Sequence, residues 1–132
     1  MAHSLRLALW EPEIPPNTGN IARLCAANHI EMHLIGRLGF RVDERSLKRA
    51  GLDYWPSVKL VQHADFETFE RAVDRVICIE VPSEQPYTKA AFLPGDCLLF
   101  GNETHGLPET ILSRHAGRIF GIPMLNDKVR SL

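Results

Sequence analysis

Short apolar runs alternate along this chain with segments whose apolar residues recur every three to four positions. The runs predict strands near residues 5–9, 32–35, 58–61, 75–81, 98–100 and 118–120. A helix is predicted directly after the first run. A second helix is predicted over residues 64–73, where Phe66, Phe69 and Val73 form an inward stripe. Strands that alternate with helices in this way indicate an α/β layering.

The first helix follows its strand through a turn with prolines at 15 and 16. Asn17 or Thr18 can cap it, because a short polar side chain there accepts a hydrogen bond from the first turn. The 3.6-residue spacing predicts a buried stripe that consists of Ile21, Leu24, Cys25 and Asn28. Asn20 and Arg23 then point away from the core. Taken alone, this pattern is more typical of an ordinary capped helix with an exposed arginine than of a site.

Two later strand ends repeat the arrangement. The strand at 98–100 runs into a glycine-bounded polar loop that holds Glu103, and Pro108 suits the first turn of the next helix. At the third strand end a proline breaks the pattern and leaves backbone groups of Ile122 and Met124 free to pair. Ligands of open α/β sheets bind at such strand ends, so the three segments predict one pocket.

Together these segments resemble the SPOUT superfamily of methyltransferases, and specifically the small tRNA 2'-O-methyltransferases that modify the wobble nucleotide. The family's first motif is similar to residues 11–24, its second to 100–108, and its third to 122–124 with 129–132. The resemblance implies one SPOUT domain over residues 1–132, with a mostly parallel sheet, helices on both faces and a trefoil knot. It also implies a homodimer.

The resemblance implies S-adenosyl-L-methionine as the methyl donor, S-adenosyl-L-homocysteine as the product, and no metal. In-line transfer requires a ribose oxygen placed behind the methyl and helped to lose its proton. By the resemblance, Arg23 faces the phosphate or the reacting ribose, while Asn17 and Glu103 order the loops; these are the candidate catalytic residues. The candidate cofactor-binding residues are Ile79, Gly101, Glu103, Ile122, Met124, Ser131 and Leu132.

RNA binding must rest on local charge, because the formal net charge is only −1. A basic segment lies between residues 37 and 49. From spacing alone it is equally typical of a solvated helix face with pairs such as Glu44 with Lys48. The family resemblance favours RNA, with the anticodon stem-loop of tRNA as the partner. The candidate RNA-binding residues are Asn20, Arg23, Arg41, Arg45, Lys48, Arg49 and His105.

The composition, with 45% hydrophobic and 23% charged residues among 132, fits one soluble globular domain. The early apolar run is too short for a signal peptide or a membrane span, so we expect a cytoplasmic protein without a membrane partner.

The three cysteines lack CxxC spacing and are expected to be buried reduced thiols. A helix end between His29 and His33 removes a shared metal-binding face, and both are expected at the surface. His63 and His115 have no partner that spacing identifies.

Two departures from the family pattern matter. His105 stands where close relatives often have arginine, which would make a phosphate contact weaker and dependent on pH. The chain stops at Leu132, where the family continues into the helix that closes the knot, so that helix is expected to be missing.

The sequence also excludes other classes of enzyme. The turn after the first strand reads EPEIPPNTG, whereas a dinucleotide-binding enzyme would have a GxGxxG turn there. The sequence has no GxxxxGK[ST] loop and no nucleophile elbow, which excludes kinases and hydrolases. The competing interpretation is a SPOUT-like RNA-binding or dimerisation module without catalysis.

Overall fold

The computed structural model describes residues 5–13, 15–39, 58–80 and 85–122. The strands are β1 (Arg6–Trp10), β2 (Glu31–Ile35), β3 (Leu60–His63), β4 (Arg75–Ile79), β5 (Asp96–Phe100) and β6 (Ile119–Phe120). The helices are α1 (Pro15–Ala27), α3 (Phe66–Ala72) and α4 (Glu109–Arg114), with single 3₁₀ turns η2 (Tyr87–Lys89) and η3 (Ala116–Arg118). The predicted strands, and the predicted helices that fall within these residues, are present with small shifts at their ends.

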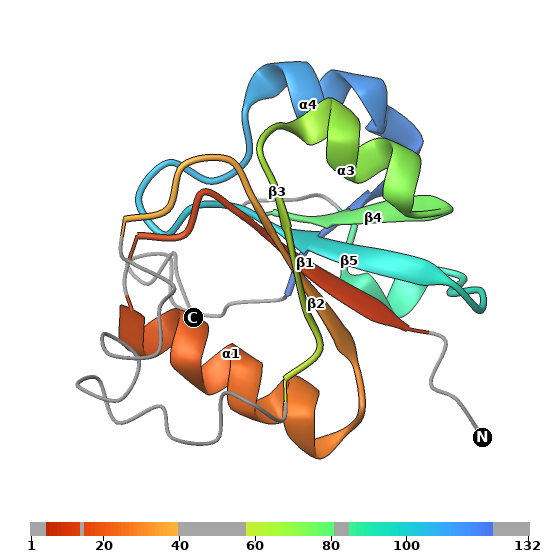
Figure 1. Cartoon of the computed structure of the whole chain (residues 1–132). Coiled ribbons are helices and arrows are strands. Elements are labelled where there is room, and N and C mark those ends of the chain that lie inside the picture. Colours follow the sequence, from red (N-terminus) through yellow and green to blue (C-terminus); the bar gives the residue numbers. More distant parts are fainter. Residues whose placement is uncertain (1–4, 14, 40–57, 81–84, 123–132) are drawn as a thin grey trace.

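The strands form one sheet in the order β3-β2-β1-β5-β4-β6, and neighbouring strands pair in parallel throughout. Figure 1 shows α1 on one face of the sheet and α3 with α4 on the other. The predicted α/β fold, a mostly parallel sheet with helices on both faces, is confirmed. Because the strands run the same way, their carboxyl ends lie along one edge, called here the carboxyl edge.

Strand β2 shows how the two faces of the sheet are filled. Successive side chains of a strand point to opposite faces. Met32 and Leu34 pack with Cys25 of α1 in one cluster, whereas Ile35 packs with Phe69 of α3 in another. The three residues predicted as the inward stripe of α3 are all buried. Burial on both faces explains why the central strands read as continuous apolar runs.

Helix α1 begins earlier than the sequence predicts. It starts at Pro15, so Asn17 and Thr18 lie inside its first turn and the prediction that one of them caps the helix is wrong. Proline fits the first helical position because its φ suits the helix and an N–H there would have no intrahelical partner. The buried residues of α1 are Thr18, Gly19, Ala22 and Cys25, and the half-buried Ile21, a member of the predicted stripe, packs against the same cluster. Leu24 is 57% exposed, because it lies more than about 100° around the helix from the line through Thr18, Ala22 and Cys25. Asn28, which follows the last residue of the helix, is also exposed.

A buried chain of polar groups corrects the surface position predicted for His33, which is 1% exposed. Its Nδ1 lies 2.7 Å from Nε2 of His63, its Nε2 lies 2.6 Å from Oε1 of Glu31, and the planes of the two rings are parallel. The carboxylate must accept the His33 Nε2–H, so His33 Nδ1 accepts from His63 Nε2–H when both rings are neutral. Burial lowers the pKa of both histidines. His115, also buried, has Glu70 as its partner at 3.1 Å.

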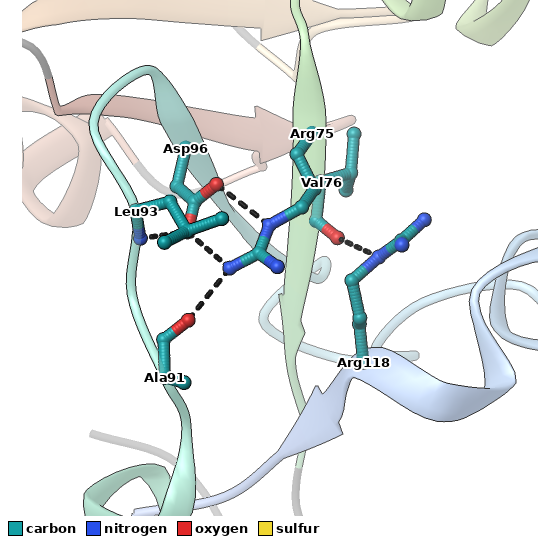
Figure 2. A network of polar contacts seen from close by, with 6 residues as sticks. All are labelled: Arg75, Val76, Ala91, Leu93, Asp96 and Arg118. Atoms are coloured by element: carbon teal, nitrogen blue, oxygen red, sulfur yellow. Dashed lines mark hydrogen bonds and ion pairs between the residues drawn. The ribbon is translucent and has the colours of Figure 1, made fainter.

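Arg75 and Asp96 join β4 to β5 at the edge opposite the carboxyl edge (Figure 2). The guanidinium binds both oxygens of the carboxylate, from Nε to Oδ1 at 2.8 Å and from Nη2 to Oδ2 at 2.7 Å, and also donates to the carbonyl of Ala91 at 2.7 Å. Leu93 N–H donates to Asp96 Oδ2 at 2.8 Å. The hydrogen bonds from Arg75 lower the pKa of Asp96, and burial opposes this only in part. This network ties the connection before β5 to the sheet.

Cys25, Cys78 and Cys97 are buried free thiols, as predicted. Burial raises the pKa of Cys25 to about 11 and that of Cys78 to about 12, so these thiols stay protonated at neutral pH. Among the described residues no group of three or more His, Cys, Asp or Glu side chains is arranged to hold a metal ion. In the same part of the chain no helix is long and apolar enough to cross a membrane.

Candidate active site

The three predicted junctions meet at the carboxyl edge of the sheet. β1 and β5 are paired neighbours, so the loops that follow Trp10 and Phe100 leave the sheet side by side. β4 lies on the other side of β5 and pairs with β6 through Ile79 and Phe120. The topology therefore brings the ends of β1, β5, β4 and β6 together in that order.

Glu103 links the loop after β1 to the loop after β5 through hydrogen bonds. The backbone N–H of Glu13 donates to both carboxylate oxygens of Glu103, at 3.0 Å to Oε1 and 3.2 Å to Oε2. The contact joins residues that are 90 positions apart in the sequence. It supports the loop-ordering role expected for Glu103.

Asn102 and Glu13 form a second connection between the same loops, which the sequence motifs did not indicate. Asn102 Nδ2 donates to the carbonyl of Glu11 at 2.6 Å and to Oε1 of Glu13 at 2.8 Å. Its Oδ1 accepts from the backbone N–H groups of Thr104 and His105, at 2.8 and 3.0 Å. An asparagine that begins a loop commonly makes such backbone bonds, which is the one local signal the sequence carried.

Two further carboxylates bind backbone amides of neighbouring loops. Glu11 Oε2 accepts from Arg37 N–H at 3.0 Å, which links the ends of β1 and β2. Glu80 Oε2 accepts from Leu107 N–H at 2.7 Å, which links the ends of β4 and β5. With the contact between Glu103 and the loop after β1, the loops of β2, β1, β5 and β4 are joined in their order across the sheet. The carboxyl edge is thus a connected frame.

Gly101 lies where this frame is most closely packed. A Cβ added to it would meet the carbonyl carbon of Gly106 at 2.4 Å and the nitrogen of Leu107 at 2.6 Å. Gly106 itself has φ +67°, a conformation that favours glycine. The turn after β5 therefore folds back directly against Gly101, and this close approach of two backbone segments requires a residue without a side chain.

An apolar surface flanks the frame on the β4 and β6 side. Ile79 and Phe120 are each 7% exposed, and they cluster with the half-buried Phe100 and Ile122. Ile79, Gly101 and Ile122, three of the residues predicted to bind cofactor, thus lie on neighbouring strand ends. Apolar side chains next to backbone groups are typical of a pocket for an adenine ring.

The polar side of α1 faces solvent. Asn17, Asn20 and Arg23 are all exposed, and their three-residue spacing places them along one side of the helix. His105 is exposed on the loop after β5. The structure thus leaves Asn20, Arg23 and His105, which are predicted to contact RNA, accessible to a ligand. Asn17, which is predicted to order the loops, is exposed as well.

Comparison with known proteins identifies the family. Residues 4–132 match the family described as SpoU rRNA Methylase. The tRNA (cytidine(34)-2'-O)-methyltransferase of Aeromonas hydrophila is 44% identical over 92% of this chain and 80% of its own length. The protein of the same name from Escherichia coli K12 is 40% identical over 93% of this chain and 80% of its own length. This chain belongs to the SpoU methylase family.

Solved structures agree with this assignment. A structure described as giving insights into the 2-OH methylation of C/U34 on tRNA is 47% identical, covers 98% of this chain and 86% of that chain, and has a TM-score of 0.88. An AdoMet-bound rRNA methyltransferase from Sinorhizobium meliloti is 25% identical, covers 100% of this chain and 51% of that chain, and has a TM-score of 0.79. The predicted resemblance to SPOUT methyltransferases is confirmed.

Several predicted site residues of this SpoU methylase lie outside the described residues. They are Arg41, Arg45, Lys48, Arg49, Met124, Ser131 and Leu132. The first four belong to the predicted RNA surface and the last three to the predicted cofactor pocket, and these assignments stay predictions. The knot and the predicted domain limits also stay predictions.

Proposed function

We propose that this protein is a methyltransferase that transfers a methyl group from S-adenosyl-L-methionine to the 2'-hydroxyl of the wobble nucleotide of tRNA, a cytidine or uridine. The observation that carries the proposal is the match of nearly the whole chain to relatives with this named activity, at 40–44% identity. The frame at the carboxyl edge supports it, because its hydrogen bonds join the loops that begin the first and second motifs, and Ile122 of the third motif packs against the neighbouring cluster of Ile79 and Phe120.

The described part of the cofactor pocket fits the proposed methyl donor. When bound, the donor supplies an electrophilic methyl group on a sulfonium and leaves as S-adenosyl-L-homocysteine. In this proposal Ile79 and Ile122 offer apolar contact for the adenine, and Gly101 lets the turn after β5 pack directly against the strand. Met124, Ser131 and Leu132 complete the pocket in this proposal. Glu103 acts by holding the loop after β1.

On the RNA side, Arg23 is the residue proposed to contact the reacting nucleotide. A guanidinium can hold a phosphate by two hydrogen bonds and can stabilise the alkoxide that develops on the ribose oxygen. Asn17 and Asn20 lie on the same side of α1 and would support this contact. The anticodon stem-loop would extend over His105 and over the basic residues Arg41, Arg45, Lys48 and Arg49.

We further propose that the protein acts as a homodimer in the cytoplasm, where its tRNA substrate is found. The dimer rests on the resemblance to the small tRNA 2'-O-methyltransferases, and Leu24, 57% exposed on α1, is one apolar side chain that a second subunit could cover. Sedimentation of the protein at several concentrations tests this. A monomer at all concentrations would contradict it.

The experiment that tests the function is transfer of labelled methyl from S-adenosyl-L-methionine to unmodified tRNA, with nuclease mapping of the product. We expect one ribose methyl at the wobble nucleotide. Arg23→Ala should reduce transfer by at least about a hundredfold, as loss of a transition-state contact does, with S-adenosyl-L-homocysteine binding unchanged. Arg71→Ala, which removes an exposed arginine from α3, is the control and should stay fully active. RNA binding without transfer or cofactor binding would favour the non-catalytic module instead.

A further inference from the structure

We propose that Glu13 and Asn102 form a positioning pair for the methyl transfer. The pair would fix the start of α1, and with it Arg23, relative to the cofactor-binding loop after β5. The inference rests on the proposed function, because that reaction requires Arg23 and the loop to be held in one geometry. Neither residue is among the candidate site residues that the sequence motifs pointed to.

Asn102 has the hydrogen-bonding groups that this position requires. Both bonds from its side-chain Nδ2 cross to the loop after β1, while both bonds to its Oδ1 stay within its own loop. Its backbone N–H and carbonyl pair with Gly106, at 3.1 and 2.9 Å. The residue is only 9% exposed. A buried side chain with two donors facing one loop and an acceptor facing the other can be an amide, but neither a carboxylate nor an apolar group.

Glu13 is held from the opposite loop by three consecutive residues. Asn102 donates to its Oε1, Glu103 accepts its backbone N–H, and Thr104 Oγ1 donates to its Oε2 at 3.3 Å. The backbone and the side chain of Glu13 are therefore both fixed. Removal of the carboxylate alone leaves the bond between its N–H and Glu103 in place, so the fold of the loop can survive while its exact position changes.

Helix α1 begins two residues after Glu13, so the position of Glu13 is coupled to that of Arg23 within the helix. Glu13 lies two residues before Pro15, and the φ angles of Pro15 and Pro16 are restricted, which leaves little freedom to absorb a shift. Arg23 lies about 12 Å along the helix from Pro15, so a tilt of about 5° moves it by about 1 Å. A misplacement of about 1 Å can reduce catalysis by roughly a hundredfold.

Kinetic measurements on Glu13→Ala, Asn102→Ala and the double variant test the pair. We expect each single variant to reduce kcat by about ten- to a hundredfold, with the dissociation constant of S-adenosyl-L-homocysteine changed less than about threefold. The combined loss in the double variant should be clearly smaller than the product of the two single losses, because both changes remove the shared bond between Asn102 and Glu13. Glu13→Gln should retain most activity, since its amide oxygen can accept from Asn102. Glu67→Ala, which removes an exposed carboxylate from α3, is the charge-matched control.

Amide hydrogen exchange gives a readout that does not depend on activity. Asn102→Ala should increase exchange between Glu13 and Arg23, with no change in β4 or α3, whereas the Glu67 control should change nothing in that segment. The proposal that the pair positions α1 would be overturned by unchanged exchange in that segment or by an unchanged kcat. It would also be overturned if the losses of the two single variants multiply in the double variant. If the wild-type protein transfers no methyl to tRNA, the proposed function fails, and the exchange data alone then decide whether the pair positions α1.

Discussion

Replacement of Gly101 by alanine tests how closely the loop after β5 lies against the strand. The added Cβ would lie 2.4 Å from the carbonyl carbon of Gly106, 2.6 Å from its Cα and 2.6 Å from the nitrogen of Leu107. These are backbone atoms, so no side-chain rotation relieves the contact. The loop must retreat by about 1 Å to reach an ordinary carbon–carbon separation of about 3.5 Å.

The magnitude follows from two contributions. Overpacking of this kind costs about 1–3 kcal/mol. The retreat also stretches the 2.7 Å bond from Leu107 N–H to Glu80, and a hydrogen bond to a charged group contributes about 1.5–3 kcal/mol. Because the loop can relax in part, we expect unfolding free energy to fall by about 2–4 kcal/mol. Affinity for S-adenosyl-L-homocysteine should fall by at least about tenfold, which corresponds to about 1.4 kcal/mol.

The assay is urea denaturation followed by circular dichroism, with calorimetric titration of S-adenosyl-L-homocysteine. Gly117→Ala is the matched control, since a Cβ added to Gly117 would meet nothing within 4 Å, and stability should change by less than about 0.5 kcal/mol. Neither glycine is among those described with positive φ, so the difference between the variants reports contact alone. A Gly101→Ala protein with the stability and affinity of the wild type would refute the reasoning.

Two further predictions concern stability. Burial lowers the pKa of His33 and His63 below their usual 6.5, so the unfolded chain binds more protons and unfolding free energy should fall as pH drops below about 6.5, by at most about 1.4 kcal/mol per pH unit for each histidine. His63→Gln should flatten this slope in urea titrations, and an unchanged slope would contradict the assignment. Arg75→Ala should lower unfolding free energy by about 3 kcal/mol at pH 7, because it leaves the 1% exposed carboxylate of Asp96 without its cationic partner. Lys59→Ala, whose side chain is 76% exposed, should change it by less than about 1 kcal/mol, and equal effects of the two variants would be inconsistent with the burial argument.

The strands and the overall fold class could be predicted because the central strands are buried on both faces, which leaves apolar runs in the sequence. The buried line of α1 could be predicted only in part: Cys25 is buried and Ile21 is half-buried against the same cluster, as the spacing predicts. Hydrophobicity selects Leu24, but the small residues Thr18 and Ala22 form the contact with the sheet together with Cys25, and Leu24 faces solvent. Hydropathy alone does not show which side of a helix packs closely.

The sequence did not predict the burial of polar side chains, for a related reason. His33 is stable inside the protein because His63, 30 residues away, provides a hydrogen-bond partner. Glu13 and Asn102 are 89 residues apart and meet only because β1 and β5 are neighbours. Glu103 could be predicted from the motif resemblance, whereas its partners required the strand order. The sequence alone therefore indicates where the site is but not which contacts hold it together.

The position of β1 in the sheet has a consequence for synthesis of the protein. β1 ends at Trp10, but its neighbour β5 begins only at Asp96, so residues 11–95 must be translated before the two can pair. At 5–20 residues per second this takes roughly 4 to 17 s. During that interval β2 and β3 can join one side of β1, while the other side presents unpaired N–H and C=O groups. The nascent chain therefore exposes its most central strand edge until β5 leaves the ribosome, and aggregation during translation should be greatest when elongation slows before residue 96.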